Sequence, residues 1–490
     1  MHKQALLFIL LCFSFSTMSA DIFLADRQFT EKKYEQAKAS YLEAAELGNP
    51  HAYYQLANMY FNGLGGDKDP INAMLYFYLA AEQNFHNSEK LITDILASLS
   101  PDEKDNVLKI LDEYKQSHGK QQILQRYFPI IDKEKQQTLL TFNGEETLKT
   151  VFHPEDADME NFMSTFGGDT FFEDDGSSDF AEDSIELLIS TPKTPFLILD
   201  HDIHTDGSVR YSTQVQKFGL YKPLLEQFAL FPLATPEFNG TPVDFASRTY
   251  LGAAALNKFA LLNENPKIYE QVIRQTRKFK NGKTISDRFN LAILMLNFPW
   301  VEQTENEAEE ILLSLSKQGH SPAMYEYGFK LYREQRDIEQ AIFWISEASK
   351  YGLVRAEYRL AKILQSSPWV INDEKKALFW FESAMEKGEI SARIRATDIL
   401  FTSTDESIQS YDLAVEYLKV LEEFGIDDPE YHYLTALKFK QGEHRNIKLA
   451  VENLEKAIFR GQLNNWDVSA WQDLLRDITT GKIFVTDFES

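Results

Sequence analysis

The densest group of side chains with metal-ligating chemistry is the run Asp200-His201-Asp202-Ile203-His204-Thr205-Asp206. Carboxylates and imidazoles are common ligands of divalent metals. Side chains alternate between the two faces of a strand, so His201 and His204 would point to opposite faces and could not hold one ion together. Four side chains share one face but lead into a turn, where solvated aspartates are expected; they are Asp200, Asp202, His204 and Asp206. We therefore predict no metal and no cofactor.

Two charged segments allow two interpretations each. Residues 155–183 contain eleven acidic and no basic residues, which favours a mobile acidic insertion. The alternative is a calcium site at Glu173, Asp174, Asp175 and Asp179, although the spacing lacks the alternation and the closing glutamate of an EF-hand loop. Residues 274–288 carry a basic cluster that either complements the C-terminus of a helix or docks the acidic segment; it comprises Arg274, Arg277, Lys278, Lys280, Lys283 and Arg288.

Residues for covalent catalysis are scarce. The single cysteine, Cys12, lies in the apolar run from Ala5 to Phe15. The sequence contains no Gly-x-Ser-x-Gly turn, no His-Glu-x-x-His motif and no phosphate-binding glycine loop. The sequence therefore predicts a protein that is not an enzyme, with an envelope hydrolase as the remote alternative.

The N-terminus and the net charge indicate a compartment. Lys3, the apolar run and the small residues up to Ala20 are typical of a secretory signal peptide, and the run is too short to cross a bilayer as a helix. The chain has 75 acidic against 50 basic residues, for a net charge of −25. Such a surface repels nucleic acid. We expect a periplasmic protein that binds no nucleic acid and has no transmembrane segment after cleavage.

Seven alanines recur at intervals of 33 to 37 residues within two groups. Each is followed after eleven residues by a glycine or, once, by Asn84, and this period is typical of helical hairpins stacked in a solenoid. The stripe at positions zero, four and seven is apolar or small, and the glycine suits a left-handed helix cap. The alanines and glycines are Ala37, Gly48, Ala73, Ala308, Gly319, Ala341, Gly352, Ala377, Gly388, Ala414, Gly425, Ala450 and Gly461. At position three, four aromatic side chains are predicted to pack in the core or between repeats; they are Tyr76, Trp344, Trp380 and Tyr417.

The first unit leads from Leu56 through Tyr60 and Gly63-Leu64-Gly65-Gly66 to Ala73. This pattern resembles the Sel1-like repeat family, over about residues 30–95 and 305–470. The later units lack the glycine-rich loop, so we expect their turns to differ in shape. The resemblance implies a scaffold that binds proteins and implies no activity.

The central segment predicts strands around 196–199 and 209–215, a helix over 220–231 and a final strand ending near Tyr250. Asp206-Gly207 is a hairpin signal between the first two strands. Together with Phe231-Pro232 and the Gly-x-Pro-Val sequence from Gly240, this order resembles the TonB C-terminal domain family. The resemblance implies strand addition of an extended peptide along Pro242, Val243, Asp244, Phe245, Ala246 and Ser247.

These expectations combine into a mainly α-helical protein with two Sel1/TPR-like arrays flanking a small α+β domain. The predicted parts are a signal peptide (1–20), an N-terminal array with a capping helix (21–130), a linker with the acidic insertion (131–192), the TonB-like domain (193–252) and a C-terminal array (253–490). The predicted function is a non-catalytic periplasmic scaffold for a protein or extended peptide of the cell envelope, with an accessory role in TonB-type transport or envelope assembly. The alternative is a Sel1-type regulator or adaptor that acts through its arrays alone.

Overall fold

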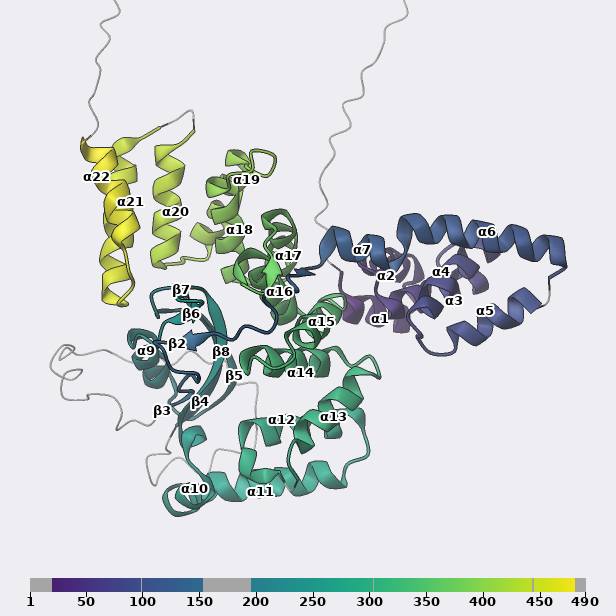
Figure 1. Cartoon of the computed structure of the whole chain (residues 1–490), viewed down its shortest axis with the longest axis horizontal. Helices are drawn as coiled ribbons and strands as arrows, with labels where there is room; N and C mark the ends of the chain where they lie inside the picture. The colour runs from purple at the N-terminus through teal and green to yellow at the C-terminus, as the bar shows by residue number, and fades with distance from the viewer. Residues whose placement is uncertain (1–19, 98, 153–194, 303, 443–444, 481–490) are drawn as a thin grey trace, which may run out of the picture. The chain divides into compact units, whose positions relative to one another are not determined.

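The computed structural model describes residues 20–97, 99–152, 195–302, 304–442 and 445–480 (Figure 1). The contacts divide the chain into two compact units. The first unit contains the residues up to Pro129 together with 346–362 and 373–399, and the second contains 130–345, 363–372 and 400–490. Each unit therefore combines segments that are distant in the sequence. The predicted boundaries at residues 20, 130, 192 and 252 stay predictions.

Helical hairpins make up most of the described chain. The first seven helices are α1 (Ile22–Thr30), α2 (Tyr34–Glu46), α3 (Pro50–Asn62), α4 (Pro70–Glu82), α5 (Ser88–Ala97), α6 (Pro101–His118) and α7 (Lys120–Tyr127). The later ones are α10 (Lys258–Glu264), α11 (Pro266–Asn281), α12 (Ile285–Asn297), α13 (Glu307–Ser316), α14 (Ser321–Arg333), α15 (Ile338–Ser349), α16 (Val354–Ser366), α17 (Glu374–Glu386), α18 (Ile390–Thr402), α19 (Tyr411–Glu423), α20 (Pro429–Lys440), α21 (Ile447–Leu463) and α22 (Ser469–Thr480). No helix in this part of the chain is long and apolar enough to cross a membrane.

The repeat alanines are buried, because small side chains let paired helices approach closely. All seven are at most 2% exposed. The predicted left-handed caps are also confirmed, with a positive φ at Gly48, Asn84, Gly319, Gly352, Gly388 and Gly425. The period of the sequence therefore specifies both the packed stripe and the end of the first helix in these repeats.

Gly461 is the exception, and the prediction of a helix cap is wrong there. It lies inside α21, and Asn465 adopts the left-handed conformation instead, with φ of 57°. A Cβ atom at position 461 would approach Val468 Cγ1 to 2.6 Å. Glycine is needed here because the segment after the helix packs closely against it.

The short N-terminal array does not stand alone within its unit. The Ile22 N–H donates to the Tyr351 carbonyl (3.3 Å), and the Asn49 side-chain amide donates to the Lys350 carbonyl (2.9 Å). At Gly352 a Cβ atom would lie 2.1 Å from the Ala20 carbonyl oxygen. Two hairpins are too few for a stable solenoid, and this contact with the repeat around residue 350 extends them.

The predicted capping helix of the first array is α6. It begins at the predicted serine-proline step, where the Ser100 N–H donates to the Glu103 carboxylate over 3.0 Å as in a capping box. The helix packs against α4. With α7, it covers the first helices of the array, as Figure 1 shows.

The central domain contains a four-stranded sheet with the strand order β3-β8-β4-β5. These strands are β3 (Val151–Phe152), β4 (Phe196–Ile203), β5 (Val209–Phe218) and β8 (Phe245–Gly252), and α9 (Lys222–Leu230) follows β5. The order strand, strand, helix, strand is as predicted. Small pairs complete the domain: β2 (Thr141–Phe142) with β6 (Pro236–Phe238), β6 with β7 (Thr241–Pro242), and β1 (Ile130–Ile131) with β9 (Val370–Ile371).

Candidate functional site

The aspartate and histidine run lies along β4 and the turn that follows it. Asp200, His201 and Asp202 are buried in β4, and His201 Nε2 lies 2.8 Å from the Thr249 hydroxyl of β8. His204 follows the end of the strand. Among the described residues, no three His, Cys, Asp or Glu side chains are grouped in a way that could hold a metal ion. The calcium alternative at residues 173–179 lies outside the described residues.

A buried ion network ties the sheet to a repeat helix. Asp200 of β4 lies opposite Arg248 of β8, and the Arg248 guanidinium donates to both of its carboxylate oxygens at 2.6 and 3.0 Å. The same guanidinium donates to Glu326 of α14 over 2.9 Å. The three side chains are 0%, 2% and 5% exposed for Arg248, Asp200 and Glu326. Burial alone would lower the pKa of Arg248, but the two carboxylates raise it, so the guanidinium stays charged.

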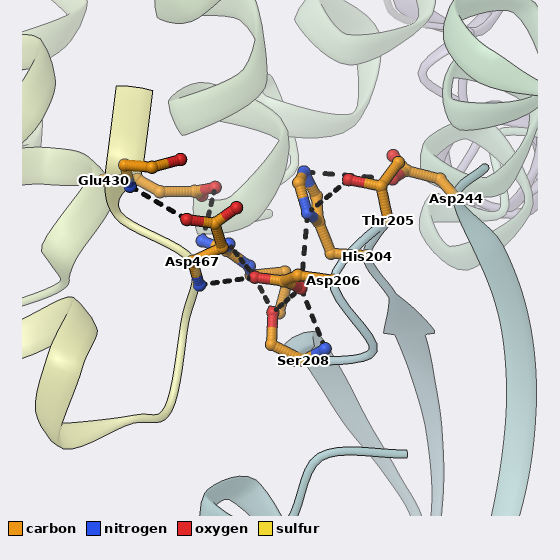
Figure 2. A network of polar contacts seen from close by, with 9 residues as sticks. His204, Thr205, Asp206, Ser208, Asp244, Glu430 and Asp467 are labelled. Carbon is orange, nitrogen blue, oxygen red and sulfur yellow. Dashed lines mark hydrogen bonds and ion pairs between the residues drawn. The ribbon is translucent and has the colours of Figure 1, made fainter. Parts of the chain in front are cut away.

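A second polar network surrounds the Asp206-Gly207 turn, as Figure 2 shows. The Asp206 carboxylate accepts from the N–H and hydroxyl of Ser208 (2.9 and 2.5 Å), and from the N–H of Asp467 after α21 (2.7 Å). Arg210 contributes a fourth bond (3.2 Å), and its guanidinium lies 3.6 Å over the Trp466 ring. The turn and the start of β5 are therefore fastened to the last repeats by the hydrogen bond from Asp467, the Arg210–Glu430 ion pair (3.8 Å) and one cation–π contact.

Titration of Asp206 makes this connection sensitive to acid. Burial by itself would raise its pKa, but hydrogen bonds from His204, Ser208 and the Asp467 N–H hold the pKa well below the usual value of 3.8. Because the pKa of Asp206 is lower in the folded state, the unfolded chain binds more protons than the folded chain at pH values between the two pKa values. The stabilisation is present above the unfolded-state pKa and is lost as the pH falls towards the folded-state one.

We therefore expect the Asp206→Asn variant to show a weaker pH dependence of stability than the wild type. Between about pH 5 and pH 2, the wild-type free energy of unfolding falls partly through protonation of Asp206, and asparagine cannot be protonated there. Urea denaturation at several pH values measures this dependence. The control is Glu103→Gln. It also removes a carboxylate whose pKa is lowered, but this carboxylate lies at an exposed helix start, outside the Asp206 network. Equal pH slopes for wild type and Asp206→Asn contradict the expectation.

The residues predicted to capture a peptide lie at and before β8. Pro242 is exposed in β7, and Val243 and Asp244 are partly exposed. Phe245, Ala246 and Ser247 are buried, and β8 pairs with β4 over its whole length and with β3 at Tyr250 and Leu251. Phe245–Ser247 thus pair with β4 on one side, and strand addition along these residues stays a prediction.

The basic cluster is divided among local partners. Lys278 and Lys280 lie in the last turn of α11, where cations complement the helix dipole. Lys280 also lies 3.8 Å from Glu307, and Arg288 donates to the Ser314 hydroxyl over 3.1 Å. These contacts favour the helix-end interpretation for those residues. The acidic segment 155–183, the other predicted partner, lies outside the described residues.

One repeat of the first unit binds a segment of the chain through its backbone. The Trp380 indole N–H donates to the Tyr127 carbonyl (2.7 Å), and the Lys376 ammonium donates to the Phe128 carbonyl (3.0 Å). The Tyr127 ring packs on Phe379, with centroids 4.8 Å apart. Two consecutive carbonyls and one aromatic ring are thus recognised by three side chains of a single helix, α17.

The residue after Tyr127 anchors the same segment. Phe128 is buried, its ring centroid lies 5.4 Å from that of Trp380, and the Lys350 ammonium lies 5.2 Å from the centre of its ring. A buried aromatic anchor flanked by main-chain hydrogen bonds is a usual form of peptide recognition. The arrangement gives this repeat helix the geometry of a peptide-binding site.

The sequence had placed Trp380 in the packing stripe, which the structure confirms, but had assigned it no ligand. Phe379 and Lys376 were not singled out. The signal that identifies them is the phenylalanine-tryptophan pair that recurs at the same repeat position as Phe343-Trp344. A pair conserved in register between two repeats points to a shared face of the helix.

The comparisons with known proteins identify the repeats. The Sel1 repeat family model matches residues 50–85, 321–352 and 354–389. A protective antigen present in uropathogenic Escherichia coli strains and displaying an SLR fold is similar in structure, with 14% identity and a TM-score of 0.34, over 93% of this chain and 78% of that one. A Sel1 repeat protein from Oxalobacter formigenes has 19% identity and a TM-score of 0.30, over 45% of this chain and 63% of that one. A search of curated proteins finds no significant match.

The family match covers both arrays but does not include the central domain. The resemblance of residues 193–252 to the TonB C-terminal domain family gains no support from these comparisons, and it stays a hypothesis. The first match contains α3 and α4, and the other two contain α14 to α17. The chain therefore carries Sel1 repeats at residues 50–85, 321–352 and 354–389.

Proposed function

We propose that this protein is a non-catalytic scaffold of the cell envelope that binds a protein partner through its Sel1 repeats. Sel1-repeat proteins generally mediate protein–protein interaction, and solenoids present extended surfaces for that purpose. The contact that supports the proposal most directly is the one between α17 and Tyr127–Phe128, in which Trp380 and Lys376 hold two main-chain carbonyls. A repeat helix with this chemistry binds main-chain carbonyls of a protein segment independently of most of that segment's side chains.

A periplasmic location is part of the proposal and rests on the signal-like residues 1–20. Fractionation of cells that produce the full chain tests it. Recovery of the processed protein with the periplasmic contents is the expected result, and recovery of the unprocessed protein in the cytoplasm contradicts it.

The binding surface is tested by site-specific photo-crosslinking in the cells from which the protein comes. A photoreactive amino acid is placed at exposed Phe343 on a repeat, at exposed Thr241 beside the predicted peptide strand, or at exposed Lys109 on α6 as the background control. Protein adducts formed from position 343, above those from position 109, support binding through the repeats. A lack of adducts at 343 in cells where 241 forms them overturns it.

Adducts formed from position 241 favour the alternative, in which a TonB-like domain captures an extended peptide. Capture along Pro242 to Tyr250 uses main-chain hydrogen bonds, so Asp244→Pro should abolish it. Adducts that persist at 241 in the Asp244→Pro variant rule out strand addition. The two surfaces are thus distinguished within one set of strains.

A further inference from the structure

Two consecutive Sel1 repeats carry the same side chains at the same positions of their first helices. Ala341 is followed by Ile342-Phe343-Trp344, and Ala377 is followed by Leu378-Phe379-Trp380. The residue before each alanine has a long side chain with N–H donors, Gln340 in one repeat and Lys376 in the other. The two helices therefore present equivalent groups, and the state of one copy can be compared with that of the other.

The copy in α17 is occupied. Phe379 packs on the Tyr127 ring, the Trp380 N–H donates to the Tyr127 carbonyl, and Lys376 donates to the next carbonyl along the chain. Trp380 is 0% exposed as a result of this and its other packing. This copy shows which ligand the three positions recognise: an aromatic residue at the end of a helix, with its own carbonyl and that of the following residue.

The copy in α15 has the same groups without such a segment among the described residues. Phe343 is 39% exposed, Gln340 is exposed, and Trp344 is 8% exposed. The Trp344 indole N–H is buried and has no hydrogen-bond partner in the described chain. Buried N–H groups nearly always have a partner, and leaving the bond unmade is unfavourable. An incoming carbonyl would supply the missing acceptor.

The neighbourhood of Trp344 suits an aromatic ligand. The Tyr327 ring, partly buried, lies edge-on to Trp344 with centroids 6.4 Å apart, and Phe343 lies 5.0 Å from it. Because the indole N–H is covered, a carbonyl reaches it only after a neighbouring side chain moves. An incoming aromatic ring would form further ring contacts here.

From these contacts we infer that Gln340, Phe343 and Trp344 form a binding site for a segment of a partner protein that ends a helix in an aromatic residue, as Tyr127 ends α7. The Phe343 ring packs on the aromatic side chain, Trp344 donates to that residue's carbonyl, and Gln340 donates to the following carbonyl. The inference rests on the proposed function and assigns the binding to one helix of the repeat at residues 321–352.

The test uses the full chain and a fluorescent peptide with the sequence of residues 124–131, which contains Tyr127 and Phe128. Binding is measured by fluorescence anisotropy. Trp344→Phe removes the N–H and keeps an aromatic ring, and it is expected to weaken binding about threefold to tenfold, the effect of one hydrogen bond. Phe343→Ala is expected to weaken binding to a similar degree. A peptide with alanine in place of the tyrosine should bind the wild-type protein no better than the original peptide binds Phe343→Ala.

A surface variant is the control for this site. Lys109→Ala, at an exposed position of α6, leaves the α15 copy intact and should not change the affinity. Phe343 is on the surface, so Phe343→Ala keeps the fold, and an unchanged melting temperature verifies this. Wild-type affinity in both Trp344→Phe and Phe343→Ala overturns the inference. If position 343 forms crosslinks but the α15 variants do not change the peptide affinity, this site is refuted and the proposed function is still supported.

Discussion

Replacing Arg248 with alanine should lower the free energy of unfolding by about 3 to 5 kcal/mol, because it leaves two buried carboxylates without their cation. Asp200 and Glu326 are both almost completely buried, and Arg248 is the guanidinium that bonds to each. Loss of the cation also removes the bonds by which the guanidinium joins β4 to the repeat helix α14. Urea denaturation of the full chain measures the loss.

A charge-free version of the network is the control for this effect. Arg248→Met combined with Asp200→Leu and Glu326→Leu removes all three charges and fills a similar volume, which in buried networks is often neutral or stabilising. Recovery of most of the lost stability in the triple variant identifies uncompensated charge as the cause. If Arg248→Ala unfolds at the wild-type urea concentration, the network does not stabilise the fold.

Replacing Trp380 with alanine is expected to cost about 3 to 5 kcal/mol, the usual range for truncating a buried tryptophan. The ring packs against Phe128 and Phe379, and its N–H holds the Tyr127 carbonyl. The variant should therefore release the end of α7 as well as create a cavity. Amide hydrogen exchange at residues 124–129, faster in the variant than in the wild type, reports this release.

The equivalent tryptophan of the preceding repeat provides a matched comparison. Trp380→Phe loses a hydrogen bond and should cost about 1 kcal/mol more than Trp344→Phe, whose N–H has no partner in the described chain. Both changes remove the same atoms from the same repeat position. Equal losses in the two variants would show that the bond to the Tyr127 carbonyl does not contribute to stability.

The sequence predicted the repeats well because their signals are local. The small side chain of Ala341 allows close helix packing, and the glycine eleven residues later allows a left-handed turn. Both requirements arise within a single hairpin. The turn at Asp206-Gly207 and the order of strands were predicted for the same reason. The prediction failed at Gly461 because α21 continues to Leu463 there, and the glycine instead leaves room for Val468 just after the helix.

The binding geometry of the repeats was not predictable in the same way. Trp380 was expected to pack, and nothing in its own repeat indicates that its N–H meets the carbonyl of Tyr127, 253 positions earlier in the chain. Arg248 likewise sits in β8, and its partner Glu326 is 78 positions away. Contacts of this kind depend on tertiary packing, which one sequence does not encode in its periodicity.

The contact between Asn49 and Lys350 also bears on the order in which the protein folds during its synthesis. The two residues are 301 positions apart, and a ribosome needs roughly 15 to 60 s to make that length at about 5 to 20 residues per second. Helices α1 to α3 therefore emerge long before the hairpin on which they pack. For that interval the growing chain exposes the apolar face of an unfinished array, and chaperones that bind such surfaces have time to engage it.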